Sequence, residues 1–365
     1  MRPAESAAAI RGCRLCGGAL RDGFVAREQH LGLLEPFGYA RCEPCDLVQL
    51  VDEPTHMGRF YPDGYYAWSG TAGAASVGEP ARTRLARRLV ARAMLRGGAA
   101  EALARRLRGW LAADFPAWLV GQGAALRLSL DTPVLDVGCG AGTHLRALAR
   151  FGFSRLAGVD AYLPAPRDAA PGVPIHVGEI DAIGQPYGVV MFHHSLEHMR
   201  DPVGALRAAG ERLLPEGRLL VRIPVLGAAW RVYGAHWVQL DAPRHRFLFG
   251  VDGFLRAARA AGLEAVSVRW DSGAFQFWGS EQYRMGIALA APESHARDPA
   301  RSPFDAAQIA AWQASAEQLN AAEDGDQACF VLRRASASSA EPGSARRVMP
   351  SRDGSGARTA GASRG

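Results

Sequence analysis

Residues 134–142 form a short apolar run that ends directly in three closely spaced glycines, Gly138, Gly140 and Gly142. Glycines after a buried strand let the backbone turn sharply and approach a ligand closely, which a side chain would prevent. Two other interpretations are a tight turn without a ligand and a dinucleotide site of the GxGxxG type. The spacing here is GxGxG, and Thr143 stands where a dinucleotide site has Gly or Ala. The run therefore predicts a cofactor loop at the carboxyl end of a buried strand.

The segment around this loop alternates strand-like and helix-like runs, which is typical of a parallel sheet with crossover helices. Asp201 and Pro202 provide an N-cap and a first-turn proline for one of the helices. We expect strands at residues 133–137, 155–159, 188–192, 218–223, 264–270 and 328–332, and helices at residues 143–152, 202–214, 252–262 and 306–319.

Three further signals follow the glycine loop in order. Asp160 stands eighteen residues after Gly142, at the end of the second expected strand, where a carboxylate can accept hydrogen bonds from both hydroxyls of a ribose. The pair Glu179-Ile180 comes next, and Glu179 can also be interpreted as a plain surface carboxylate. The last signal is the run at 192–202, which reads Phe-His-His-Ser-Leu-Glu-His-Met-Arg-Asp-Pro.

Together these four signals resemble the motifs of class I S-adenosylmethionine-dependent methyltransferases. The resemblance implies an α/β fold: a Rossmann-like mixed seven-stranded sheet with helices on both faces. It also implies that the glycine loop lies under the methionine part of S-adenosylmethionine, that Asp136 organises the amino end, and that Asp160 binds the ribose. The cofactor residues expected on this basis are Asp136, Gly138, Gly140, Gly142, Asp160, Ala161, Glu179, Ile180, His193 and His194.

The N-terminal part of the chain contains two CxxC pairs separated by 25 residues. Four thiolates from two such pairs can surround one Zn²⁺ tetrahedrally, at about 2.3 Å each. The alternative is four unligated thiols in a reducing cytosol. The duplicated spacing favours a closed, structural zinc site formed by Cys13, Cys16, Cys42 and Cys45, whereas Cys139 and Cys329 are expected to be packing residues.

A length of 365 residues favours more than one structural unit. We expect a zinc-ribbon-like module with its own core, then a helical linker that contains an arginine-rich pattern broken at Gly97-Gly98, then the methyltransferase domain. The last segment has almost no large apolar residue, so it cannot offset its ordering entropy and is expected to be disordered. The four expected ranges are 1–70, 71–130, 131–334 and 335–365.

Two runs rich in aromatic and polar side chains, at 60–68 and 236–247, are candidate linings of an acceptor pocket. The second run can equally be a loop that packs on the sheet. It is similar to a W…LD.PRH…F pattern in a subgroup of these methyltransferases that also has an N-terminal double-CxxC module. Some members methylate carbon atoms of sugars, but they carry a large C-terminal domain that we expect this chain to lack. The candidate catalytic residues are His198, His236, Asp241 and His245.

Composition narrows the choice of partner and location. All 42 basic residues are arginine and are spread along the chain, so the net charge of +6 gives no concentrated patch for nucleic acid. Residues 1–10 lack the apolar core of a signal peptide, and no run approaches the roughly 18 apolar residues of a membrane span. We therefore expect a cytoplasmic protein whose acceptor is a small molecule or glycan precursor.

Two other functions compete with this one. An RNA methyltransferase is favoured by the pI of 9.2 and by a similar order of modules in some zinc-bearing rRNA methyltransferases. It is disfavoured because His193-His194-Ser195 lacks an Asn/Asp-Pro-Pro-Tyr-like pocket for a flipped base. A non-catalytic scaffold is disfavoured by the intact glycines and Asp160. The sequence gives no indication of the oligomeric state.

Overall fold

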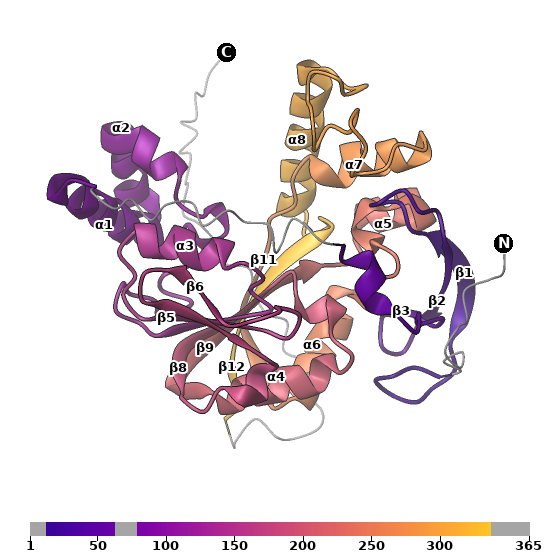
Figure 1. Ribbon diagram of the computed structural model, residues 1–365, viewed down its shortest axis with the longest axis horizontal. Coiled ribbons are helices and arrows are strands. Elements are labelled where there is room, and N and C mark those ends of the chain that lie inside the picture. Colours follow the sequence, from indigo (N-terminus) through magenta and orange to yellow (C-terminus); the bar gives the residue numbers. More distant parts are fainter. Residues whose placement is uncertain (1–11, 63–78, 337–365) are drawn as a thin grey trace, which may run out of the picture.

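The computed structural model describes residues 12–62 and 79–336. At its centre is an eight-stranded sheet with the order β11-β12-β9-β8-β4-β5-β7-β6 (Figure 1). Five neighbouring strands, from β9 to β7, are parallel, whereas β12 is antiparallel to both β9 and β11. The bounds are β4 (Val134–Val137), β5 (Leu156–Asp160), β6 (Arg167–Ala170), β7 (Val173–Val177), β8 (Tyr187–His193), β9 (Leu213–Pro224), β11 (Leu263–Trp270) and β12 (Gln327–Arg334). The mixed Rossmann-like sheet is confirmed, and its seven strands are extended at one edge by the short antiparallel strand β6.

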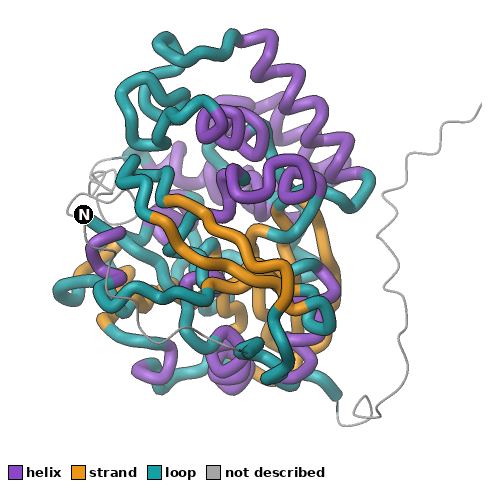
Figure 2. Tube along the Cα trace, turned by 90° about the vertical axis from the view of Figure 1, so that its right-hand side faces the viewer, coloured by secondary structure: helices purple, strands orange, loops and turns teal. Residues whose placement is uncertain are grey.

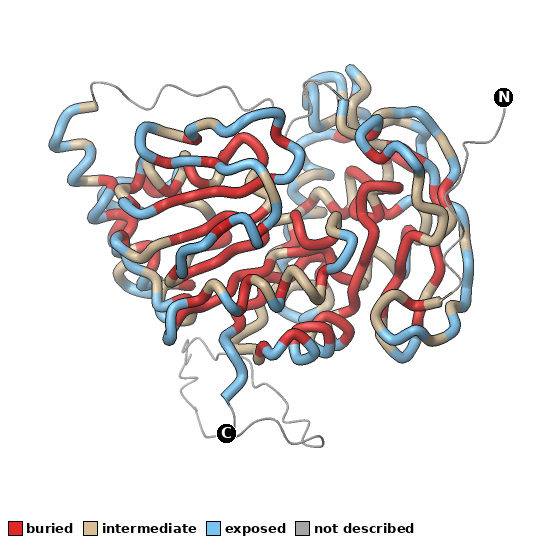
Figure 3. The backbone as a smooth tube through the Cα atoms, turned by 60° about the horizontal axis from the view of Figure 1, so that its bottom comes forward, coloured by how far each residue is buried: buried red, intermediate tan, exposed pale blue. Residues whose placement is uncertain are grey.

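Helices cover both faces of this sheet, as expected. On one face, α4 (Pro202–Glu211) and α6 (Val251–Ala260) bury Leu206 and Phe254. On the other face, α1 (Ala81–Arg96), α2 (Gly98–Ala113) and α3 (Thr143–Arg150) bury Met94, Leu111 and Leu145. The strands between the two layers are buried while the outer helix faces are exposed (Figure 3). The sheet is therefore the centre of the apolar core.

Helix boundaries follow the local signals in the sequence. The Asp201 side chain accepts a hydrogen bond from the Gly204 amide at 2.8 Å and so caps α4, with Pro202 at its first position. The helical linker is interrupted between α1 and α2 at Gly97, whose φ of 70° lies in the left-handed region that favours glycine. Helix α8 (Ala306–Ala321) was expected, whereas the short α5 (Ala228–Tyr233) and α7 (Phe275–Arg284) were not.

The N-terminal segment forms a second, four-stranded sheet with the order β1-β2-β3-β10. Three strands come from this segment: β1 (Arg21–Arg27), β2 (Pro36–Cys42) and β3 (Leu47–Leu50). The fourth strand, β10 (Phe247–Phe249), comes from the loop before α6, and its Leu248 pairs with Val48 of β3. This sheet faces the reader in Figure 2, beside the helices of the larger unit. All four strands pair antiparallel, so the first and last thirds of the chain share one ladder.

The expectation of two separate cores is wrong. Cys42 and Leu47 pack in the same apolar cluster as Phe249, Phe254 and the central sheet. The other face of the small sheet packs against the segment 229–242. The cores merge because β10 supplies the edge strand of the small sheet, which no local sequence signal indicated. The expected boundary at residue 70 and most of the expected tail lie outside the described ranges.

None of the helices within 12–62 and 79–336 is both long and apolar enough to span a bilayer.

Trp237 tests how strongly the shared core depends on the loop before β10. Its side chain is fully buried, and its Nε1 donates to Asp326 Oδ2 at 2.9 Å. Trp237→Ala is expected to lower the free energy of unfolding by about 3–5 kcal/mol, because it empties an aromatic site. Urea unfolding followed by circular dichroism measures this loss. The matched control is Trp110→Ala, since Trp110 is 65% exposed, and an equal effect in both variants would contradict the packing role.

Candidate functional site

Strand β4 carries the glycine loop to the carboxyl edge of the sheet. Gly138, Gly140 and Gly142 have φ values of 71°, 54° and 79°, where a side chain is strained. A Cβ at Gly138 would lie 2.5 Å from the Cβ of Ser195. The Gly140 amide donates to Asp160 Oδ2 at 2.8 Å. Glycine is therefore required for the loop to lie against the ends of β5 and β8.

A pocket of about 640 Å³ opens above this loop. It contains eight of the side chains or backbone positions predicted for the cofactor or catalysis: Gly138, Gly140, Asp160, Ala161, Glu179, Ile180, His194 and His198. Its remaining lining is Tyr61, Val137, Tyr162, Gly178, Asp181, Ser195, Met199, Arg200, Asp201, Gly204, Ala205 and Ala208. The predicted residues outside this lining are Asp136, Gly142, His193, His236, Asp241 and His245.

Two carboxylates beside the glycine loop, one in the pocket lining and one behind it, differ in their surroundings. Asp160 accepts hydrogen bonds from the Gly140 and Tyr162 amides, one on each oxygen, and each oxygen keeps a second lone pair for a ligand. Asp136 is buried behind the loop, and its Oδ2 has no hydrogen-bond partner among the residues described. Burial, with a contribution from the Asp160 charge, raises the pKa of Asp136 well above its usual range. An acceptor left without a donor beside a pocket fits a ligand with a cationic or N–H group.

The two histidines that follow β8 point to different places. His194 lines the pocket with a φ of 52°, an uncommon left-handed conformation for a non-glycine residue. His193 instead lies against Trp118 and His144, with ring centroids 4.9 and 3.8 Å away. Burial lowers the pKa of His193 well below its usual range. The structure therefore brings only His194 of the pair to the predicted cofactor pocket.

Two tyrosines line the pocket that were not among the predicted site residues. The rings of Tyr61 and Tyr162 stack with their centroids 5.8 Å apart, and the Tyr61 hydroxyl lies 3.2 Å from Nδ1 of His198. Tyr61 belongs to the aromatic run 60–68, of which 63–68 lie outside the described residues. That run was therefore the only sequence signal for Tyr61. The position of Tyr162, two residues after Asp160, could have indicated the second tyrosine.

The run 236–247 forms a largely buried connector rather than a pocket wall. His236 is exposed and lies outside the lining, and Trp237 belongs to the apolar core. Asp241 is paired with the buried guanidinium of Arg244. Burial alone would raise the pKa of Asp241, but Arg244 holds it below its usual range. For Trp237 and Asp241, the structure supports the interpretation of this run as a loop that packs on the sheet.

His245 lies behind His198, away from the pocket lining. Their ring centroids are 4.6 Å apart, and Nδ1 of His245 donates to the Gln239 carbonyl at 2.7 Å. Two arginines of the same loop hold His198: the carbonyl of Arg244 accepts from the His198 side chain at Nδ1, and the guanidinium of Arg246 donates to the His198 carbonyl. Arg246 also donates to Glu53 at 2.7 and 2.9 Å. The connector thus holds His198 in place from behind.

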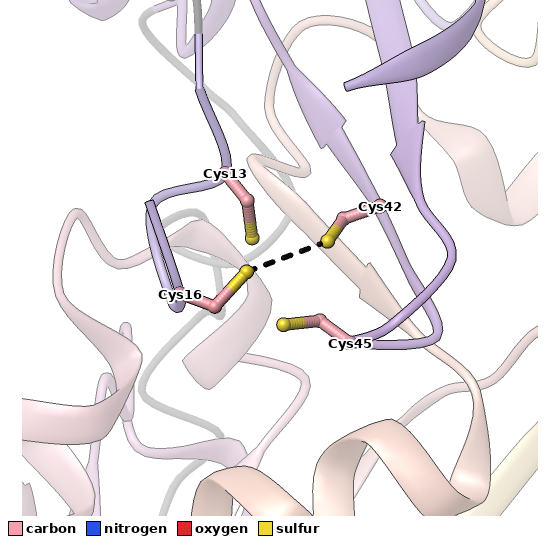
Figure 4. A group of neighbouring side chains, drawn as sticks. All are labelled: Cys13, Cys16, Cys42 and Cys45. Atoms are coloured by element: carbon pink, nitrogen blue, oxygen red, sulfur yellow. Dashed lines mark hydrogen bonds between the residues drawn. The ribbon is translucent and has the colours of Figure 1, made fainter. Parts of the chain in front are cut away.

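The four cysteines of the two CxxC pairs come together as predicted (Figure 4). Their sulfur atoms lie within 4.8 Å of one another, and the Cys16 and Cys42 sulfurs are 3.7 Å apart. A tetrahedral zinc with bonds of about 2.3 Å requires sulfurs about 3.8 Å apart. The amides of Leu15 and Gly18 each point to a cysteine sulfur at 3.4 Å, as suits a thiolate. The cluster therefore fits a closed zinc site.

Comparison with known families gives one strong match. Residues 82–268, about half of the chain, match the family model described as "Methyltransferase domain". This range contains the glycine loop, every other sequence-predicted cofactor residue and the run 192–202. No curated protein matches the chain.

Several solved structures match the chain at low identity. The cyclase SpnF is 21% identical, with a TM-score of 0.39, and the match covers 65% of this chain and 83% of SpnF. The CcbJ methyltransferase from Streptomyces caelestis is 18% identical, with a TM-score of 0.34 and coverages of 61% and 94%. An S-adenosylmethionine dependent methyltransferase from Mesorhizobium loti is 18% identical, with a TM-score of 0.37 and coverages of 58% and 97%.

The cysteine cluster generates a direct prediction. We expect one zinc ion per chain to co-purify, and Cys42→Ser to lose it, because three thiolates leave the tetrahedral site incomplete. Since Cys42 packs in the shared core, its loss should lower the melting temperature of the whole chain. Elemental analysis and calorimetry measure both effects, with Cys139→Ser as the control that keeps its zinc. Chelator-free wild-type protein without metal would contradict the site.

Proposed function

Because the chain belongs to the methyltransferase-domain family, we propose that it transfers a methyl group from S-adenosylmethionine to a small-molecule acceptor, a sugar or glycan precursor among the candidates. The observation that carries this proposal is the pocket that joins the glycine loop to Asp160, Glu179 and Ile180. These are the positions at which a nucleoside with an amino-acid tail needs a close backbone, a ribose acceptor and an adenine support. A structural zinc at the four cysteines is part of the same proposal.

The residues of the pocket suit each part of this cofactor. Asp160 has a free lone pair on each oxygen for the two ribose hydroxyls. Ile180 is buried beside Glu179, and the two can support and recognise the adenine ring. The orphaned Oδ2 of Asp136 offers an unused hydrogen-bond acceptor behind the loop, where the ammonium group of the methionine part would lie.

The charge of the lining favours a small acceptor over RNA. Four carboxylates and a single arginine line the pocket: Asp160, Glu179, Asp181, Asp201 and Arg200. Phosphate groups of a nucleic acid would be repelled by such a surface, because binding of a polyanion depends on cationic side chains. Tyr61, from the N-terminal segment, and His198 also line the pocket, and they can bind a hydroxyl or carbonyl of a small molecule. We call this part of the pocket the acceptor side.

Positioning can supply most of the rate. The sulfonium of bound S-adenosylmethionine supplies an already activated methyl group, so alignment of the acceptor within the pocket is the main requirement. His198 is the imidazole of the acceptor side, and burial lowers its pKa to about 4. The ring is therefore neutral at pH 7, but at this pKa it is a weak base, so its role is to bind and orient the acceptor.

Asp160→Ala tests the cofactor site. Loss of the hydrogen bonds to a charged acceptor is expected to weaken binding of S-adenosylmethionine by about 1.5–3 kcal/mol, or roughly tenfold to 150-fold in Kd. Isothermal titration calorimetry measures this change. Asp168→Ala is the matched control, since Asp168 is exposed on β6, the next strand along the chain, and lies outside the pocket. Equal affinities in wild type and Asp160→Ala would rule out the ribose role.

A second experiment tests the transfer and the class of acceptor. The protein is incubated with methyl-labelled S-adenosylmethionine and a cell extract that has been divided into a small-molecule fraction and an RNA fraction. We expect label to enter the small-molecule fraction with wild type, and much less with Asp160→Ala at a subsaturating cofactor concentration. Label that enters only RNA would contradict the proposed acceptor class. No transfer to either fraction would favour the scaffold alternative.

A further inference from the structure

A second group of side chains that can ligate a metal lies behind the pocket. It consists of Glu197 and His198, in the short helix η4 (Leu196–His198), and His245, in the loop before β10. One ligand atom from each residue lies within 4.8 Å of the other two. The Nε2 of His245 is 3.9 Å from Oε1 of Glu197. Two distant segments therefore direct two imidazoles and a carboxylate toward one point.

The hydrogen bonds of the two imidazoles fix which nitrogen carries the proton. Nδ1 of His198 lies 3.1 Å from the Arg244 carbonyl, and Nδ1 of His245 lies 2.7 Å from the Gln239 carbonyl. A carbonyl can only accept, so each Nδ1 carries a proton, and in the neutral ring each Nε2 then keeps its lone pair. The Tyr61 hydroxyl, near the same nitrogen of His198, can share that proton as a second acceptor. Histidines that bind metals are held by this kind of second hydrogen bond.

Glu197 adds a buried negative charge to these two lone pairs. Only 1% of it is exposed, and neither carboxylate oxygen accepts a well-formed hydrogen bond within the part of the chain that the structure describes. The nearest donor is Nδ1 of His194, 3.4 Å from Oε1. Asp241 lies near the same nitrogen of His245, with its Oδ2 3.8 Å from Nε2. Such a convergence of acceptors without a cation is costly in a buried site.

We infer that Glu197, His198 and His245 bind a divalent transition-metal ion, such as Zn²⁺, Fe²⁺ or Co²⁺, beside the methyl-transfer pocket. Two imidazole nitrogens and one carboxylate oxygen occupy one side of such an ion and leave its other positions open. Bonds of about 2.0–2.2 Å require side-chain movements of about 1 Å from the present positions. The remaining polar contacts of the two histidines already match those of metal ligands.

This assignment deepens the proposed function, on which its role in the reaction rests. His198 lines the pocket, so the open positions of the ion can face the acceptor side. There the ion would act as a Lewis acid for an acceptor oxygen. His198 and His245 would then be ligands in place of a free base. The metal site itself does not depend on methyl transfer and can be tested without an acceptor.

Co²⁺ is the probe that separates this site from the cysteine cluster. Thiolate ligands give Co²⁺ intense sulfur-to-metal charge-transfer bands, whereas imidazole and carboxylate ligands give only weak d–d bands. The full chain is first loaded with one equivalent of zinc, which the four thiolates bind in preference to the imidazole and carboxylate site, and is then titrated with Co²⁺ alone. We expect weak d–d bands that saturate at one further ion per chain. A wild-type protein that takes up no Co²⁺ beyond the cysteine cluster would overturn the assignment, whatever the variants do.

Two variants locate the ion. Glu197→Gln and His245→Asn are expected to weaken Co²⁺ binding at least tenfold, whereas His56→Asn, at an exposed histidine outside the cluster, should bind as wild type does. Unchanged Co²⁺ affinity in folded Glu197→Gln protein would overturn the assignment. It would mean that a proton, and not a metal ion, neutralises Glu197. Circular dichroism checks folding. Calorimetry with S-adenosylmethionine on the same wild-type samples separates the two claims: cofactor binding without Co²⁺ binding overturns only the metal site, and the reverse overturns only the proposed function.

Discussion

The ladder between β3 and β10 is the contact on which the arrangement of this molecule depends. It joins the N-terminal sheet to the methyltransferase unit, and two buried arginines next to it extend the connection. Arg246 binds Glu53 through two hydrogen bonds, and Arg244 donates to the Phe60 carbonyl at 3.1 Å. Tyr61 follows directly in the chain. The N-terminal segment therefore reaches the pocket as one of its walls because this ladder and these two side chains fix its path.

The buried charges of the connector position neighbouring side chains more than they stabilise the fold. A buried ion pair such as Asp241–Arg244 gains little over an apolar pair of the same shape, because both groups lose their hydration. Removing one partner of such a pair, however, leaves a charge uncompensated and costs about 3–5 kcal/mol. The Arg244 carbonyl also accepts from Nδ1 of His198, and the Arg246 guanidinium donates to the His198 carbonyl. Their geometry fixes the imidazoles that lie between the pocket and the small sheet.

The sequence predicted the parts of the site that are encoded locally. The three glycines, Asp160 and the paired cysteines have strict spacings set by backbone conformation or by ligand geometry, and the structure brings each set together. The merged cores could not be predicted, because the pairing of Val48 with Leu248 has no local signal. Trp237 was ambiguous for a related reason: an aromatic side chain suits a pocket wall and a core equally well, and only its tertiary neighbours decide.

The same strand pairing has a consequence for synthesis. Strand β3 leaves the ribosome almost 200 residues before β10, and chains grow at about 5–20 residues per second. For roughly 10–40 s the nascent N-terminal sheet therefore has an open edge next to its cysteines. An unpaired edge is a template for wrong partners. The segment that contains the fourth strand also contains His245 and the two arginines that hold His198. Closure of the edge and positioning of His198 at the pocket are therefore one event.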